Sequence, residues 1–115
     1  MTMRDSIVRA RISATEFRFD PGDPTFAGHF PTQPILPGVF QIEMARTVAE
    51  SLVGGRLDIR EISKAKFQRP IRPAEVVRVE LKWSEADGAI RAYATFQVGD
   101  ERAGEVVMIL WRSES

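Results

Sequence analysis

The side chains able to move a proton in this sequence centre on one histidine. His29 is the only imidazole in the chain, and the next acidic residue after it is Glu43. A neutral imidazole can accept a proton at physiological pH, and a carboxyl group can donate one or orient a water. By spacing alone, a single histidine beside prolines is usually structural, and a helical glutamate usually belongs to a solvated face. The pair therefore needs support from the elements that carry it.

Other reactive chemistries are excluded by what the sequence lacks. It contains no cysteine, which removes disulfides, thiolate metal ligands and cysteine nucleophiles. A single histidine argues against a zinc site built from this chain alone, and we expect no metal. Sixteen basic and sixteen acidic residues cancel, so there is no overall charge for binding nucleic acid. No apolar run approaches the ~20 residues of a membrane span, and no signal segment is evident. We expect a cytoplasmic protein without nucleic-acid or membrane partners.

One helix is predicted after a proline-rich loop. Prolines at positions 31, 34 and 37 favour an extended path through residues 20–37. Residues 38–53 have helical periodicity, and glycines 54 and 55 end it. Apolar positions cover more than half of this helix, which indicates that it is mostly buried. Its polar stripe consists of Glu43, Arg46, Thr47 and Glu50. The helix thus carries Glu43, and the extended loop carries His29.

Strands are predicted on both sides of this helix. Residues 7–19 favour a strand whose alternation changes phase near Ala14 and Thr15, which suggests a bent strand or a bulge. Residues 57–69, 76–83, 90–98 and 103–112 then predict an antiparallel meander of about four strands, with a hairpin turn at Asp87-Gly88. Residues 103–112 are apolar on both faces, as in a central strand covered on both sides. The element order predicts a single α+β domain over residues 1–115, in which a sheet wraps one helix.

Residues 28–43 (GHFPTQPILPGVFQIE) resemble the signature of the β-hydroxyacyl-acyl-carrier-protein dehydratases of the FabZ/FabA type, roughly G-H-F-P-x-x-P-x-x-P-G-V-x-x-x-E. Residues 64–73 (KAKFQRPIRP) resemble the family's strand after the helix and its proline-bounded turn. The resemblance covers about residues 15–112. It implies the hot-dog fold, a curved antiparallel sheet around one long central helix, which agrees with the element order found from the pattern.

The resemblance also implies roles for three residues. His29 would be the catalytic base, Glu43 its acidic partner, and the backbone N–H of Gly38 would bind the thioester carbonyl. Dehydration of a 3-hydroxyacyl thioester needs a proton taken from C2 and the C3 hydroxyl lost as water. Free N–H groups and the positive dipole end of a helix can stabilise charge on the carbonyl oxygen. The expected reaction gives the 2-enoyl thioester without metal or organic cofactor, from a substrate carried on phosphopantetheine.

The sequence departs from the family just after Glu43. The family usually has small residues there and a glutamine four positions on, whereas this chain has Met44, Arg46 and Thr47. A neighbouring arginine keeps a carboxylate ionised, which suits orienting a water better than donating a proton. The departure leaves the pathway open between fatty-acid, polyketide and related secondary-metabolite synthesis.

Expected partners follow from the resemblance and from charge. Lys64, Lys66, Arg69 and Arg72 form a basic cluster, which is either a solvated strand face or a contact for an acidic acyl carrier protein and its phosphopantetheine. A chain of this size with one helix leaves sheet edges and an apolar helix flank that a second copy could cover, so we expect a homodimer. The family resemblance adds that His29 of one chain faces Glu43 of the other.

Two other functions remain as alternatives. A hot-dog acyl thioesterase would use Glu43 with a water to hydrolyse the thioester. A non-catalytic acyl-carrier-binding subunit would bind without turnover, although the presence of both His29 and Glu43 argues against it.

Overall fold

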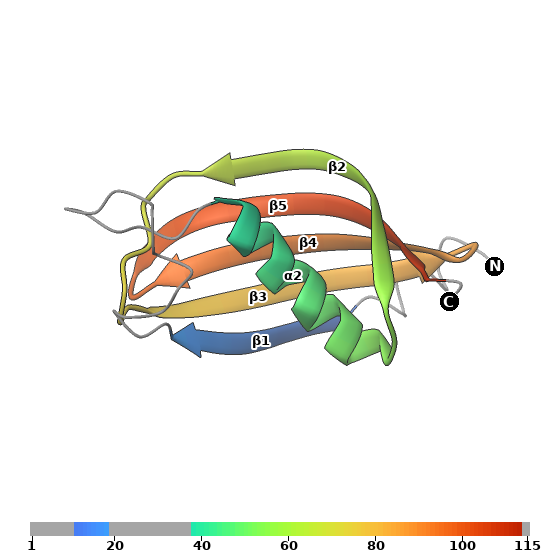
Figure 1. Cartoon of the computed structure of the whole chain (residues 1–115), viewed down its shortest axis with the longest axis horizontal. Helices are drawn as coiled ribbons and strands as arrows, with labels where there is room; N and C mark the ends of the chain where they lie inside the picture. The colour runs from blue at the N-terminus through green and yellow to red at the C-terminus, as the bar shows by residue number, and fades with distance from the viewer. Residues whose placement is uncertain (1–10, 19–37, 114–115) are drawn as a thin grey trace.

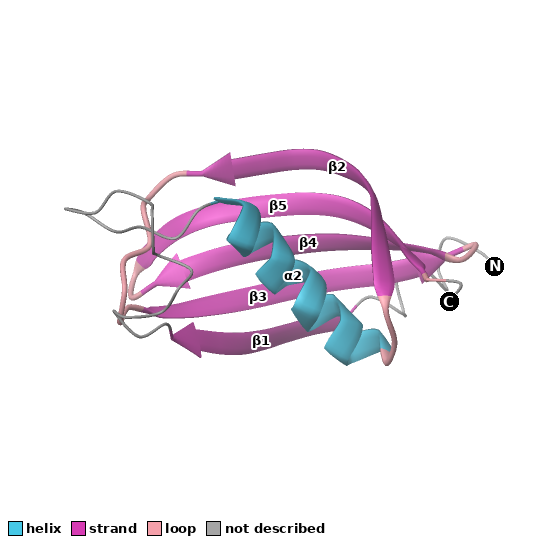
Figure 2. Cartoon of the chain, in the orientation of Figure 1, coloured by secondary structure: helices cyan, strands magenta, loops and turns pink. Residues whose placement is uncertain are grey.

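The computed structural model describes residues 11–18 and 38–113. The elements follow in the order β1 (Arg11–Arg18), α2 (Gly38–Val53), β2 (Leu57–Phe67), β3 (Val76–Ala86), β4 (Ala89–Val98) and β5 (Glu101–Arg112). The strands form one antiparallel sheet in the order β1-β3-β4-β5-β2, and α2 lies across one of its faces (Figure 1, Figure 2). β2 curves beside α2, so that the sheet wraps the helix. The predicted α+β hot-dog architecture is confirmed.

The helix has the predicted bounds, and local signals explain both ends. It begins at Gly38, directly after Pro37, and it ends where Gly54 adopts a positive φ of 77°. The Gly54 amide donates a hydrogen bond to the Glu50 carbonyl at 2.9 Å, which satisfies an end carbonyl as left-handed glycine caps do. The residues facing the sheet repeat with helical spacing and are buried: Gln41, Met44, Ala45, Val48 and Ala49.

The core lies between α2 and the strands behind it. Alternation on β3 and β4 points one set of side chains at the helix, as the sequence predicted. Completely buried members are Val77, Val79, Leu81, Ile90, Ala92, Ala94 and Phe96. β3 and β4 are joined by the predicted hairpin turn, where Asp87 and Gly88 have φ values of 53° and 81°. Two consecutive positive φ angles are those of a type I′ turn, which matches the twist of the paired strands.

Two details of the predicted sheet are wrong. β2 does not continue a simple meander beside β3, because it lies at the opposite edge and pairs with β5. The segment between β2 and β3 carries the chain across the sheet, from the edge strand β2 to β3, which lies next to the other edge strand β1. A bulge near Ala14 and Thr15 is not found, since β1 pairs with β3 without a register shift. The irregularities fall instead in β2, at 59–61 and 62–64, and between β4 and β5. β1 is an edge strand, so its apolar pattern is weakly tied to the core.

β5 is central, as predicted, but its two faces differ. Val106, Met108 and Leu110 point at the helix and are buried. Val107 and Ile109 point the other way and are only half-buried, and Trp111 keeps 40% of its surface exposed. The described part of this chain therefore leaves the face away from α2 uncovered.

Candidate active site

The described part of the predicted site is the first half of α2 and what packs against it. His29 lies outside the described residues, so its predicted role stays a prediction. Gly38 opens the helix, and Glu43 follows it by five residues, about 7.5 Å along the helix axis. Both belong to the same end of α2, as the predicted site requires.

Gly38 is in close contact with the aromatic ring of Phe67, the last residue of β2. A Cβ placed on Gly38 would lie 2.7 Å from Cε2 of that ring and 2.9 Å from Cδ2. A Cβ on Gly104 of β5 would lie 3.2 Å from Cδ1 of the same ring and 2.7 Å from the Lys66 carbonyl oxygen. The ring of Phe67 is thus held between two glycines. The glycine at the helix start is needed for this packing whether or not a substrate approaches its N–H.

Glu43 points away from the sheet and binds Arg46. Arg46 Nη2 donates a hydrogen bond to Glu43 Oε2 at 2.6 Å, one helical turn away. The side chains are 46% exposed for Glu43 and 35% for Arg46. The pairing expected from the sequence is confirmed, and it fixes one carboxylate oxygen. The buried Nε of Arg46 finds no hydrogen-bond partner among residues 38–113.

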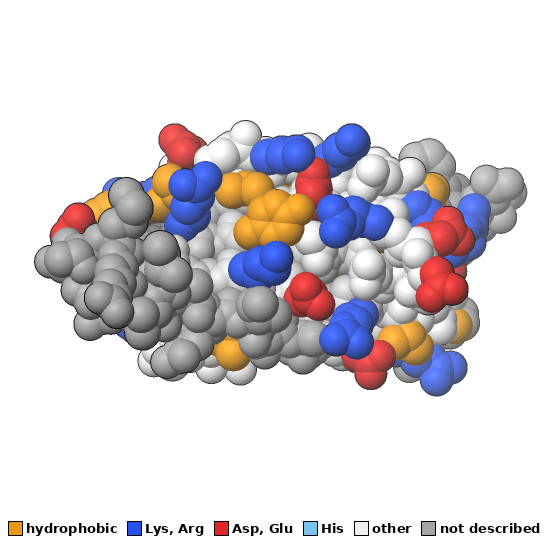
Figure 3. Space-filling view, turned by 180° about the vertical axis from the view of Figure 1, so that it is seen from behind, with side chains coloured by type: hydrophobic (Ala, Val, Ile, Leu, Met, Phe, Trp, Pro, Cys, Tyr) orange, Lys and Arg blue, Asp and Glu red, His pale blue; other side chains and the backbone are white. Residues whose placement is uncertain are grey.

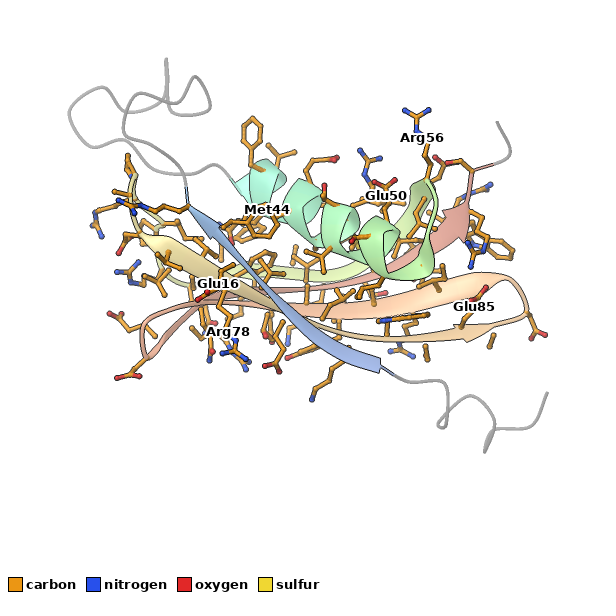
Figure 4. The ribbon with its side chains drawn as sticks, turned by 90° about the horizontal axis from the view of Figure 1, so that it is seen from below. Glu16, Met44, Glu50, Arg56, Arg78 and Glu85 are labelled. Atoms are coloured by element: carbon orange, nitrogen blue, oxygen red, sulfur yellow. The ribbon has the colours of Figure 1, made fainter. Side chains whose placement is uncertain are left out.

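A polar hollow of about 320 Å³ lies beyond Arg46, toward the end of α2. Glu50 and Arg56 line it from the helix side of the sheet (Figure 4). The Glu50 carboxylate is already engaged, because Oε2 accepts a hydrogen bond from the Leu57 amide at 2.8 Å. This bond joins the end of α2 to the start of β2, so Glu50 holds the helix in place beside the hollow.

The four basic residues predicted to bind a carrier do not share one surface. Lys64 and Lys66 lie on β2, and Lys64 binds Glu105 on the sheet face away from α2. Arg69 lies after β2 and pairs with Glu75 at 2.7 Å and with Glu101 at 3.4 Å. Arg72 is exposed in the following turn. Because Phe67 touches Gly38, the turn that follows Phe67 begins beside the helix start.

The ApeI dehydratase family matches residues 7–107 of this sequence. The chain belongs to the ApeI-like dehydratases. A 3-hydroxyacyl-[acyl-carrier-protein] dehydratase FabZ of Chlamydia trachomatis serovar L2 is 35% identical over 106 residues, 81% of this chain and 69% of the relative. The FabZ of Caulobacter sp. strain K31 is 31% identical over 93 residues, 72% of this chain and 57% of the relative. The chain thus spans about three fifths to two thirds of the length of these relatives.

Solved structures agree with the family. A chain of the dehydratase heterocomplex ApeI:P from Xenorhabdus doucetiae has 29% identity and a TM-score of 0.78, with 88% of each chain covered. Structures of a thioesterase and of a probable thioesterase, each at 12% identity, share the fold, and identity this low says nothing about activity. The predicted dehydratase family is confirmed. No helix in the described ranges is long and apolar enough to cross a membrane.

The sequence reasoning missed Phe67 in this ApeI-like site. Phe67 lies in the segment KAKFQRP, which resembles the family's strand after the helix but does not indicate a role for this ring. An aromatic residue at the end of a strand and a glycine at a helix start are both common, and nothing local shows that they touch. Their contact depends on how β2 and α2 pack.

Proposed function

We propose that this chain removes water from a 3-hydroxyacyl thioester carried on an acyl carrier protein and forms the 2-enoyl thioester. The observation that carries the proposal is the start of α2, where Gly38 and Glu43 stand about 7.5 Å apart along one helix of a dehydratase-family fold. The first turn of a helix offers amide groups to an oxygen that gains charge, and Glu43 lies between one and two turns further along the same helix.

In the proposed reaction, the proton taken from C2 is the one that the leaving hydroxyl receives. The imidazole of His29 takes the proton from C2 while the Gly38 N–H stabilises negative charge on the thioester oxygen. The C3–O bond then breaks, and the leaving hydroxyl receives a proton from the imidazolium of His29. Water and the enoyl thioester leave, and the enzyme is unchanged. No step needs a cofactor beyond the phosphopantetheine of the substrate.

Glu43 is proposed to orient rather than to donate. One of its oxygens accepts the charge-assisted hydrogen bond from Arg46, as a carboxylate does. The second oxygen, which has no hydrogen bond to the residues that the structure describes, would accept a hydrogen bond from the C3 hydroxyl and so align the C3–O bond for elimination. Arg46 is a positioning residue in this scheme, because it acts on the substrate only through Glu43.

Carrier binding is proposed near the turn after β2. Arg69 and Arg72 follow Phe67, whose ring contacts Gly38, so a carrier held there could present its thioester to the helix start. Lys64 and Lys66 point elsewhere and are not needed for delivery. Reversing the charge of Arg72 should raise KM for a carrier-bound substrate more than for a pantetheine analogue. The same reversal at Arg91, on the other face, is the matched control.

A homodimer is proposed from the exposed edge and apolar surface of the chain. β2 is an edge strand with nearly all of its residues exposed. Apolar side chains near it stay open: Val39 (61% exposed), Phe40 (38%), Ile62 (43%) and Phe67 (43%). An uncovered edge beside apolar side chains favours association. The ApeI:P structure is a heterocomplex by its own description, so a different chain as partner is the competing outcome.

The reaction is tested by following two products at once. Wild-type protein is incubated with a 3-hydroxyacyl-carrier thioester, and enoyl absorbance and free thiol are recorded. Dehydration predicts enoyl absorbance without thiol, which His29→Ala should lower by about 10²–10⁴-fold. Thr47→Ala, on the same polar stripe as Glu43, is the control and should retain activity. Release of thiol would identify a thioesterase, and binding without turnover a non-catalytic subunit.

Mixed dimers test whether the site is shared. His29→Ala and Glu43→Ala chains, each expected to be inactive alone, are unfolded together and refolded. If His29 of one chain works with Glu43 of the other, a heterodimer has one intact site and one with both changes, and about half of the wild-type activity returns. If each site lies within one chain, every site carries one of the two substitutions, and no activity returns. Continued inactivity of a confirmed heterodimer would then contradict the shared site.

A further inference from the structure

The sheet has a second face that the dehydratase site does not use. We call the face turned away from α2 the outer face. Strand register places four of its residues side by side: Lys82 on β3, Tyr93 on β4, Val107 on β5 and Lys64 on β2. Two positive charges therefore flank a ring and an apolar side chain, and the row continues past Lys82 to Ile12 on the edge strand β1. Figure 3 shows this face, with apolar side chains in its middle and basic ones around them.

An apolar strip runs along the outer face on β5. Val107 and Ile109 are half-buried, and Trp111 is 40% exposed with the Arg60 guanidinium 6.0 Å from its ring centroid. The strand is apolar on both faces, a pattern typical of a strand with cover on both sides. Only the α2 side is covered within the described residues. Apolar surface rimmed by charge is typical of a protein interaction site.

The outer face is also hollowed beside this strip. Two adjoining hollows of about 280 and 190 Å³ share Lys82 and Tyr93. Arg102, which pairs with Glu105 at 3.4 Å, lines the first hollow and Arg91 lines the second, so three cationic side chains including Lys82 border this depression. Glu80 is the acidic side chain among its described lining residues. An open, elongated depression suits an extended or helical segment better than an enclosed small molecule.

Among the described residues, the acid buried in the outer face is already neutralised. Glu105 is 7% exposed and binds Lys64 Nζ at 2.5 Å, while the Tyr93 hydroxyl donates to it at 2.7 Å. The hydrogen bond from Lys64 holds the pKa of Glu105 below its usual range, so the group is a carboxylate at neutral pH. Tyr93 is thereby fixed with its ring in the face. Lys82 and Arg91 have no ion pair within residues 16–18 and 38–113.

We propose that the outer face binds an acidic, amphipathic segment of another protein. Apolar residues of that segment would cover Val107, Ile109 and the Tyr93 ring, and its carboxylates would meet the cations at the rim. Charge complementarity selects this partner over a neutral one. The surface is separate from the proposed catalytic site, because α2 lies on the other side of the sheet, as do the labelled Glu50 and Arg56 opposite Arg78 (Figure 4). The interaction would attach the enzyme to a partner rather than deliver substrate.

Binding is tested with a synthetic peptide of alternating glutamate and leucine, by calorimetry at low and physiological salt. Wild-type protein should bind it, more weakly as salt rises. The double variant Lys82→Glu/Arg91→Glu should weaken binding by about tenfold or more, and Ile109→Ser should weaken it without changing the salt dependence. Arg56→Glu, on the α2 side, is the matched charge control and should bind as wild type does. Dehydratase activity on a carrier-bound substrate should be the same in wild type and in the double variant.

Several results would overturn the proposal. Wild-type protein could fail to bind the peptide, or the double variant could bind it equally well. Polyglutamate could bind as tightly as the alternating peptide, which would remove the apolar strip from the interaction. Tighter binding of single-stranded DNA would assign the face to nucleic acid. A fall in oligomeric state of the double variant by sedimentation would assign it to a second copy. If wild-type protein has no dehydratase activity, the proposed function is contradicted. The binding measurements still decide whether the outer face binds an acidic segment.

Discussion

Adding one methyl group at Gly38 separates a packing role of this glycine from a role in binding the thioester. The new Cβ would lie 2.7–3.1 Å from three carbons of the Phe67 ring. Carbon atoms pack best at about 3.5–4.0 Å, so the ring must move by roughly 1 Å. Phe67 is 43% exposed and can move outward, which places the cost near the lower end of overpacking, about 1 kcal/mol. Gly38 is the first residue of α2, so the gain of alanine over glycine in a helix interior is not recovered in full there. The free energy of unfolding of Gly38→Ala should therefore fall by about 1 kcal/mol.

Activity should respond much more strongly than stability. The methyl group and the displaced ring would occupy the space through which a thioester oxygen reaches the Gly38 N–H. Loss of one such donor costs about 10²–10³-fold in kcat. The double variant Gly38→Ala/Phe67→Leu should relieve the crowding and restore the unfolding midpoint while activity stays low. Gly55→Ala is the control, because its Cβ would lie 3.9 Å from Arg112 Nη1 and should alter neither property.

The measurements are urea unfolding at fixed protein concentration and kcat/KM with a carrier-bound substrate. If Gly38→Ala keeps activity within tenfold of wild type, the carbonyl does not bind at this amide. If the double variant regains full activity, only the displaced ring was at fault, and Gly38 serves packing alone.

Three further predictions concern stability. The ion pair with Arg69 holds the pKa of Glu75 below its usual range. The ion pair therefore stabilises the fold fully above the usual carboxyl pKa, and this stabilisation is lost as pH falls through the lowered pKa of Glu75. The unfolding midpoint of wild type should fall more steeply below about pH 4.5 than that of Glu75→Gln. Equal slopes would show that the pair contributes nothing. Gly104→Ala should cost about 1–3 kcal/mol in urea unfolding, because its Cβ would meet a β2 carbonyl oxygen at 2.7 Å, whereas Gly55→Ala should be neutral. Phe96→Ala, at a completely buried position, should cost about 3–5 kcal/mol, and a change below 1 kcal/mol would place this side chain outside the core.

Local pattern was enough to predict the separate elements. The helix over residues 38–53 follows from the spacing of its apolar residues and from the glycine pair that ends it. The buried faces of β3 and β4 follow from strict alternation, and their hairpin follows from Asp87-Gly88. Each of these features depends on residues within a few positions of one another, so propensity and periodicity determine it. The pairing of Arg46 with Glu43 belongs to the same class, since both lie one turn apart on one helix.

Only the tertiary structure decided what meets across the sheet. It placed β2 beside β5 rather than β3, set the Phe67 ring between Gly38 and Gly104, and assigned Lys64 to Glu105 on the outer face. Strand order and register are set by which arrangement buries the most apolar surface around α2, and that sum runs over residues far apart in the chain. A slip of one residue would turn each side chain of a strand to the opposite face. The division between a catalytic side and an outer binding side is therefore a property of the packed sheet, because no single strand contains it.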